Sequence, residues 1–301
     1  MLIVGEVHTG LLRGHGPVSS AEAGLLVDLV AGEPVLRRER PRAYVRSPDR
    51  PVGVDCPLGA PARQVRGIGT VLQRAAITGG HVVQGTAWAT VEPVAGGARR
   101  PWSHYLARPG VIEAVGRWRP GELAAGFTGA ERPPSALDLG EIAGRASDMV
   151  QRALPGGGRL RLPRTGLRFV VERAERSELS RFAVHDDRLR LLHVVVPSDA
   201  EPEPLLAFAE DLALHDWLLT SVIGILERAA IGTLPLDESL RRLRPAVDYL
   251  LHLWLPAGTE WLWAEAERQA ALTRQWVLLR DRIRDQLALG AVEALSAAVP
   301  R

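Results

Sequence analysis

The residues best suited to acid–base or metal chemistry lie in an eight-residue sequence motif that occurs twice in the C-terminal third of the chain. We call the two copies the doubled phrase. Both copies have the pattern Asp-x-x-Leu-His-x-Trp-Leu; the first begins at Asp211 and the second at Asp248. A carboxylate four residues before a histidine lies on the same face of a helix, so the two side chains of each copy can meet. The doubled phrase is therefore the first place to look for function.

Three interpretations of the doubled phrase are open. In the first, each aspartate accepts the imidazole N–H of its own histidine, while the neighbouring Trp and Leu residues belong to the core. In the second, Asp211, His215, Asp248 and His252 converge between antiparallel helices as a metal or acid/base site. The third is a groove for a partner. Because the Glu-x-x-His and His-Glu-x-x-His ligand patterns are absent, we expect the structural pairing, with no bound metal and no other cofactor.

A second polar cluster surrounds the sequence Pro-Trp-Ser-His-Tyr that begins at residue 101. Trp102, His104 and Arg108 could line a pocket for an anion or a nucleotide beside a helix N-terminus. The alternative is a capped turn with a packed tryptophan, which we favour because clusters without a known motif rarely prove to be sites. The single cysteine, Cys56, would need a nearby histidine to act as a nucleophile, and a structural thiol is expected.

All lysine and asparagine are missing, so the basic charge is entirely arginine. This composition excludes Schiff-base and P-loop lysine chemistry. Between residues 37 and 46 an arginine run could contact phosphates, but Glu39 and Pro41 interrupt it, and we expect a solvated sheet edge that discourages strand pairing. A formal net charge of +2 is too small to imply nucleic acid as a partner.

The 301 residues suffice for one large or two smaller domains. Alternating apolar residues predict a first strand at 2–9, and Gly79-Gly80 predicts a two-residue hairpin turn. Ser19 with Glu22 predicts a capping box, and Asp138 a second helix cap. A short helix is expected to begin near Pro109, and 117–134 is expected to be a loop.

Strands are expected after residue 165, and helices from residue 205 onward. These elements predict an α+β fold with three parts. A β-rich N-terminal domain spans 1–125, a helix with a small β segment spans 126–200, and a helical C-terminal domain spans 201–301. No run approaches the ~18 apolar residues of a membrane span, and no signal peptide is evident, so we expect a cytoplasmic protein.

Several phrases together resemble an uncharacterised actinomycete (Streptomyces-type) protein family. They include MLIVGEVHTGLL, GVDCPL, PWSHYLARPGV, EDLALHDWLLT and RLRPAVDYLLHLW. Members of that family are encoded beside a variant P-loop protein and a methyltransferase-like protein. The resemblance implies a component of a multi-protein system and carries no catalytic role onto these residues.

The leading hypothesis is a non-enzymatic interaction or regulatory subunit with a protein partner, for which the neighbouring P-loop protein is a candidate. Its interface would use the tryptophans of the helical end, since tryptophan is enriched in interface anchors; these are Trp217, Trp254, Trp261 and Trp263. The alternative is a metal- or acid/base-dependent enzyme that uses the doubled Asp/His phrase. Neither a membrane nor nucleic acid is expected as a partner.

Overall fold

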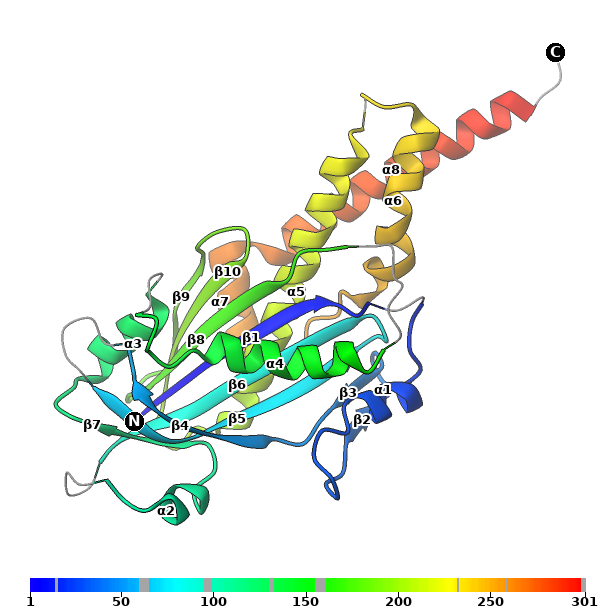
Figure 1. Cartoon of the computed structure of the whole chain (residues 1–301). Helices are drawn as coiled ribbons and strands as arrows, with labels where there is room; N and C mark the ends of the chain where they lie inside the picture. Colours follow the sequence, from blue (N-terminus) through cyan, green and yellow to red (C-terminus); the bar gives the residue numbers. More distant parts are fainter. Residues whose placement is uncertain are drawn as a thin grey trace.

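A computed structural model describes residues 1–13, 16–59, 65–94, 99–129, 133–154, 161–231, 233–257 and 259–298. Within these residues the strands form one ten-stranded sheet in the order β2-β3-β5-β7-β6-β1-β8-β10-β9, with β4 paired to β5 (Figure 1). The strands are β1 (Leu2–Leu11), β2 (Leu36–Arg38), β3 (Tyr44–Arg46), β4 (Arg50–Pro57), β5 (Arg66–Thr78), β6 (Val82–Pro93), β7 (Val111–Val115), β8 (Thr165–Arg173), β9 (Glu178–Val184) and β10 (Leu189–Val196).

The first strand of the chain, β1, lies in the interior of the sheet. It runs antiparallel to β6 on one side and to β8 on the other, so that Val4 lies opposite both Ala89 and Val170. Beyond β8, β10 pairs in parallel and β9 forms the edge. The sheet therefore continues across the boundary that the sequence suggested at residue 125.

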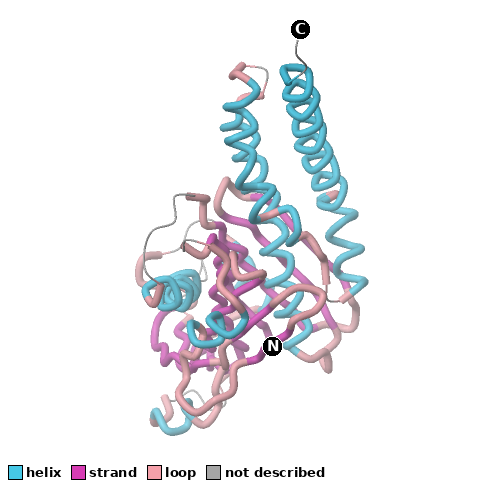
Figure 2. The backbone as a smooth tube through the Cα atoms, turned by 90° about the vertical axis from the view of Figure 1, so that its right-hand side faces the viewer, coloured by secondary structure: helices cyan, strands magenta, loops and turns pink. Residues whose placement is uncertain are grey.

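Helices cover both faces of this sheet (Figures 1 and 2). The helices are α1 (Ser20–Leu26), α2 (Trp102–Leu106), α3 (Pro120–Thr128), α4 (Leu139–Arg152), α5 (Pro202–Ala229), α6 (Leu236–Tyr249), α7 (Glu260–Ala270) and α8 (Leu272–Ala298). Leu2 and Val4 of β1 belong to an apolar cluster with residues of α3 and α4, whereas Ile3 and Val7 belong to the cluster of α5. This alternation follows from the two-residue period of a strand whose two faces are both buried.

At the C-terminal end, the last turns of α5 together with α6 and the far part of α8 project beyond the sheet (Figures 1 and 2). Trp217 of α5 is fully buried, and its indole N–H donates to the carbonyl of Pro163 at 2.8 Å. Among the described residues, no helix combines the length and the apolar composition that a bilayer span requires.

The predicted α+β class is confirmed, and so are several local signals. Ser19 and Glu22 form the capping box of α1, and the Asp138 side chain accepts from an N–H in the first turn of α4. Gly79 and Gly80 turn the chain between β5 and β6 with φ values of 59° and 68°. Because Thr78 pairs with Val82, the hairpin loop contains three residues instead of the expected two.

Two local predictions are wrong. Pro109 does not begin a helix, because α2 has already ended at Leu106 and β7 starts at Val111. The segment 117–134 is not all loop, because it contains α3. Pro120 in the first turn of α3 and Glu122 behind it are ordinary helix-start signals, which the glycine and proline content of this segment concealed.

Candidate functional site

His215 lies on the face of α5 that turns away from solvent and is completely buried. Its Nδ1–H donates to the backbone carbonyl of Asp211 at 2.7 Å, and Asp211 Oδ1 lies 3.4 Å from the same nitrogen. Nε2 then accepts the backbone N–H of Leu255 at 3.2 Å. Burial lowers the pKa of His215 to about 4, although the negative charge of Asp211 acts to raise it. The ring is therefore neutral at pH 7.

Asp211 connects three segments that are far apart in the sequence. Its Oδ1 accepts from Arg42 at 2.6 Å, and its Oδ2 accepts from the backbone N–H of Ala257 at 2.7 Å and from the indole N–H of Trp263 at 3.1 Å. Arg42 also donates to the carbonyls of Leu253 and Leu255. We call this group of contacts the Asp211 junction; it joins the β2–β3 hairpin to α5 and to the segment between α6 and α7.

The second copy of the phrase adopts a different structure. Helix α6 ends at Tyr249, so Asp248 and His252 do not share one α-helical face, and His252 lies in a 3₁₀ turn, Leu251–Leu253. Asp248 is exposed and pairs with Arg244 at 3.2 Å. His252 is exposed and its ring lies 5.9 Å from that of His81.

The structure therefore joins Asp211 with His215 and does not bring Asp248 and His252 to them. The described residues contain no group of three or more His, Cys, Asp or Glu side chains arranged to hold a metal ion. Of the three interpretations, the local Asp–His pairing describes the first copy only.

The tryptophans of the helical end differ in exposure. Trp254 stacks on Trp276 with ring centroids 4.6 Å apart, and His215 contacts both Trp254 and Trp263 edge-on. Trp217, as described above, has no exposed surface. Of the four tryptophans proposed for an interface, Trp261 is the most exposed, at 38%; Trp217 is fully buried, and Trp254 and Trp263 are partly buried against the core.

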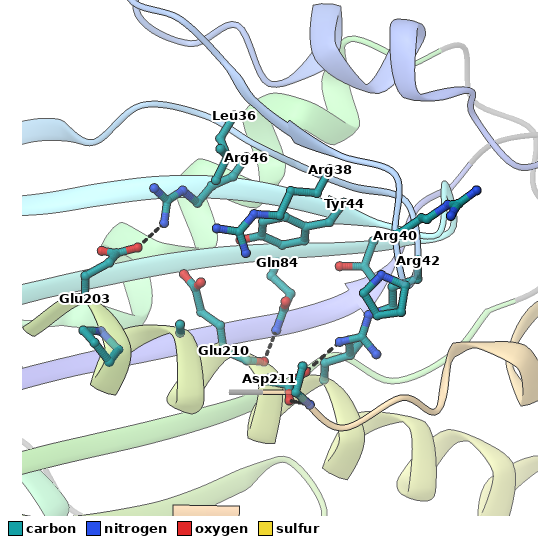
Figure 3. Close-up of a pocket in the computed structure, with 16 residues that line it drawn as sticks. Leu36, Arg38, Arg40, Arg42, Tyr44, Arg46, Gln84, Glu203, Glu210 and Asp211 are labelled. Carbon is teal, nitrogen blue, oxygen red and sulfur yellow. Dashed lines mark hydrogen bonds and ion pairs between the residues drawn. The ribbon is translucent and has the colours of Figure 1, made fainter. Parts of the chain in front are cut away.

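Beside the Asp211 junction lies a cavity of about 310 Å³ between the β2–β3 hairpin and α5 (Figure 3). We call it the hairpin cavity. Its lining residues come from β2, β3, the strands beneath, α5 and the α6–α7 connection: Leu36, Arg38, Arg40, Pro41, Arg42, Tyr44, Arg46, Thr78, Gln84, Glu203, Pro204, Ala207, Glu210, Asp211, Leu214 and Ala257. The arginine run expected at a solvated sheet edge thus forms one wall of a cavity.

A buried ion pair lies next to this cavity. Arg74 of β5, 1% exposed, donates from Nε to Glu210 at 2.7 Å, and Glu210 also accepts from the hydroxyl of Thr86 at 2.6 Å. Arg74 additionally contacts Glu203, which pairs with Arg46. Burial, and next the negative charge of Glu210, raise the pKa of Tyr44, so its phenol keeps its proton and can donate a hydrogen bond.

The ion pair of Arg74 with Glu210 was not predicted from the sequence. One signal was present: after Arg66 at its start, Arg74 is the one charged residue of β5, in a stretch rich in apolar residues, and a charge buried there requires a partner. The partner, Glu210, lies 136 residues later, and no spacing rule connects the two.

In the polar cluster of Trp102, His104 and Arg108, the basic side chains pair with nearby carboxylates. His104 lies 2.8 Å from Glu113, and Arg108 pairs with Glu113 at 3.1 Å and with Glu92 at 2.6 Å. Trp102 is 38% exposed at the start of the five-residue helix α2. The Arg108 guanidinium group and the His104 ring are already paired with carboxylates, which is the arrangement of a packed turn and not of an anion pocket. Cys56 is half-buried on β4, and burial raises the pKa of its thiol.

A further polar cleft, which the sequence did not reveal, lies on the α4 side of the sheet. Glu6 and His8 project from the same face of β1, two residues apart, with His8 Nε2 3.2 Å from Glu6 Oε1. Arg168 of β8 lies 3.2 Å from the other carboxylate oxygen. A Cβ atom at Gly140 would lie 2.5 Å from Glu6 Oε1, so α4 can approach this pair only through a glycine. Such a carboxylate–histidine pair can hold or transfer a proton.

Comparison with known proteins gives no relative from which a role could be transferred: no protein-family model, no curated protein and no solved structure matches the chain.

Proposed function

We propose that the chain is a non-enzymatic interaction or regulatory subunit of a cytoplasmic multi-protein system. The observation that carries this proposal is the projecting group formed by α6, α8 and the last turns of α5, which we call the helical arm. The arm extends beyond the sheet (Figure 1), and helices that project in this way offer surface to a partner.

Helix α8 buries apolar residues on one side and exposes other apolar residues on the opposite side. Leu272, Trp276 and Ile283 are buried against the rest of the protein. Leu278, Leu289 and Val292 are 63%, 54% and 60% exposed and lie on the opposite side, where the exposed Arg282 and Asp285 separate Leu278 from the other two. The neighbouring exposed apolar residues Leu289 and Val292 support a role in binding another protein.

Two helices of the arm, α6 and α8, pack closely against each other. A Cβ atom at Gly290 of α8 would lie 2.3 Å from Leu240 Cδ1 of α6, so the two helices approach closely at this glycine. The exposed face of α8 is therefore presented by helices that are packed against each other.

The Asp211 junction supports a non-enzymatic role for the doubled phrase. Asp211 and His215 use their polar atoms in contacts that hold segments of the chain together, as described above. The alternative, a metal- or acid/base-dependent enzyme, requires Asp248 and His252 beside them, and these two residues are exposed elsewhere.

Co-expression tests the proposal. The tagged chain is produced with the P-loop protein and the methyltransferase-like protein that are encoded beside members of the family it resembles, and complexes are separated by size-exclusion chromatography. We expect one of these proteins to co-elute. Replacing Leu289 and Val292 together by glutamate should abolish co-elution, because two charges would have to be buried in an apolar contact.

Leu25→Glu is the matched control. Leu25 of α1 is 77% exposed, like the residues of the arm, and lies outside it. Co-elution of neither protein, or equal loss with the Leu25 variant, contradicts the proposal. A homodimer of this chain that the double variant dissociates also contradicts it, since the arm would then bind a second copy.

A further inference from the structure

The hairpin cavity has the size and the composition of a small-molecule site. Its volume of about 310 Å³ lies at the lower end of the range for ligand pockets, ~300–1,000 Å³. Its walls come from segments that are far apart in the sequence, and they combine aliphatic groups, one aromatic ring and charged groups. Apolar walls with a few convergent polar groups are typical of sites that bind an organic molecule.

Most charges around the cavity already have partners. Arg42 pairs with Asp211, Arg46 pairs with Glu203, and Glu210 is held by Arg74. Each of these contacts satisfies a carboxylate with a guanidinium group, so none of the three carboxylates requires a cationic ligand.

Arg38 and Arg40 are the exception in the part of the chain that the structure describes, where neither makes an ion pair with a carboxylate. Both are exposed at the rim of the cavity. Figure 3 shows the guanidinium group of Arg38 reaching over the Tyr44 ring into the space between Arg46 and Glu210, whereas Arg40 points outward. The rim therefore carries an excess of positive charge, and Arg38 is the one of the two arginines that faces the cavity.

The remaining lining defines what the rest of a ligand can be. The ring of Tyr44 forms one wall, and Pro204, Ala207 and Leu214 of α5 form the wall opposite the hairpin. The Gln84 side chain lies on the sheet side, where its amide N–H groups already donate to the Glu210 carbonyl at 2.8 Å and to Thr9 at 3.1 Å. The interior thus favours an uncharged, flat body over a second charged group.

We propose that the hairpin cavity binds a small organic anion. Its carboxylate or phosphate group pairs with Arg38 at the rim, and its flat body lies between Tyr44 and α5. A planar guanidinium group suits both anions, because it can donate two parallel hydrogen bonds to either. This inference is independent of the proposed partner of the helical arm.

Titration calorimetry on the full chain tests the site with four probes: phenyl phosphate, benzoate, inorganic phosphate and benzyl alcohol. Phenyl phosphate, benzoate or both should bind more tightly than inorganic phosphate, which lacks the ring, and than benzyl alcohol, which lacks the charge. The tighter of the two aromatic anions identifies the class of the natural ligand as a phosphate or a carboxylate.

Three variants locate the binding. Arg38→Gln should weaken binding of the aromatic anion roughly 10- to 100-fold, the effect of losing charge-assisted hydrogen bonds. Ala207→Trp should abolish it by filling the cavity, while the far-ultraviolet circular dichroism stays unchanged, because Ala207 is exposed on α5. Arg181→Gln, at an exposed arginine of β9, is the control and should bind as the parent does.

The proposal is overturned by any of three results: neither aromatic anion binds, both bind undiminished to the Arg38 and Ala207 variants, or the Arg181 variant loses as much affinity as the Arg38 variant. The last result would assign the binding to the general positive charge of the surface.

Discussion

His215 should make the stability of the protein depend on pH between about 7 and 4. In the unfolded chain a histidine titrates near pH 6.5, whereas burial holds the pKa of His215 at about 4 in the folded protein. As the pH falls below 6.5, the unfolded chain binds a proton that the folded protein does not bind. The folded state therefore loses stability as the pH falls through this window, and the loss is complete below pH 4.

The size of the effect follows from the two pKa values. For a single site with these values, the free energy of unfolding falls by about 2 kcal/mol between pH 7 and pH 5. The structural cause is local: protonation of Nε2 would place an N–H against the N–H of Leu255 and close to the guanidinium group of Arg42, 3.4 Å away.

Urea unfolding at pH 7 and at pH 5, followed by tryptophan fluorescence, measures this effect. The His215→Gln variant should be less stable than the parent at pH 7, and its decrease between the two pH values should be smaller by about 2 kcal/mol. Other titrating groups, including Asp216, whose pKa burial raises, are common to both proteins and cancel in this comparison.

The exposed His185 provides the control, since His185→Gln should leave the pH dependence of the parent unchanged. If the parent and the His215 variant lose equal stability between pH 7 and pH 5, the buried, neutral histidine is not the cause and the reasoning is refuted.

Two further substitutions test the packing. Asp211→Ala should lower the free energy of unfolding by about 3 kcal/mol, because it leaves the largely buried charge of Arg42 without its counter-ion. Asp248→Ala, in the exposed second copy, should change it by less than about 0.5 kcal/mol. Equal losses in urea unfolding would contradict the difference between the two copies. Gly85→Val should lower the melting temperature strongly, because even a Cβ atom at this position would lie 2.0 Å from the Ala143 carbonyl oxygen of α4. Gly121→Ala, which has open space around it, should leave the melting temperature unchanged. An unchanged melting temperature for the Gly85 variant would show that α4 does not pack closely on β6.

The sequence predicted features that depend on neighbouring residues. The Ser19 capping box, the Asp138 cap and the glycine turn between β5 and β6 are set by side chains within a few positions of one another, so their spacing is informative. The α+β class also followed from the order of strand-like and helix-like segments.

The candidate site depends on distant residues, and the sequence predicted little of it. The partner of Arg42 is Asp211 and the partner of Arg74 is Glu210, separations of 169 and 136 residues that no periodicity encodes. The doubled phrase was misleading for a similar reason: identical spacing gives a helical Asp–His pair at Asp211, whereas the second copy crosses the end of α6. Two residues four apart share a helical face only if the helix continues through both, and tertiary contacts decide where the helix ends.

The interior position of β1 has a consequence for the order in which the protein can assemble during synthesis. Strand β1 is made before both of its neighbours, which emerge from the ribosome as residues 82–93 and, much later, residues 165–173. Until the second neighbour appears, one edge of β1 has unpaired N–H and C=O groups, which can pair with another nascent chain. One edge of β1 therefore stays open to aggregation after the β5–β6 hairpin has formed and until β8 is made.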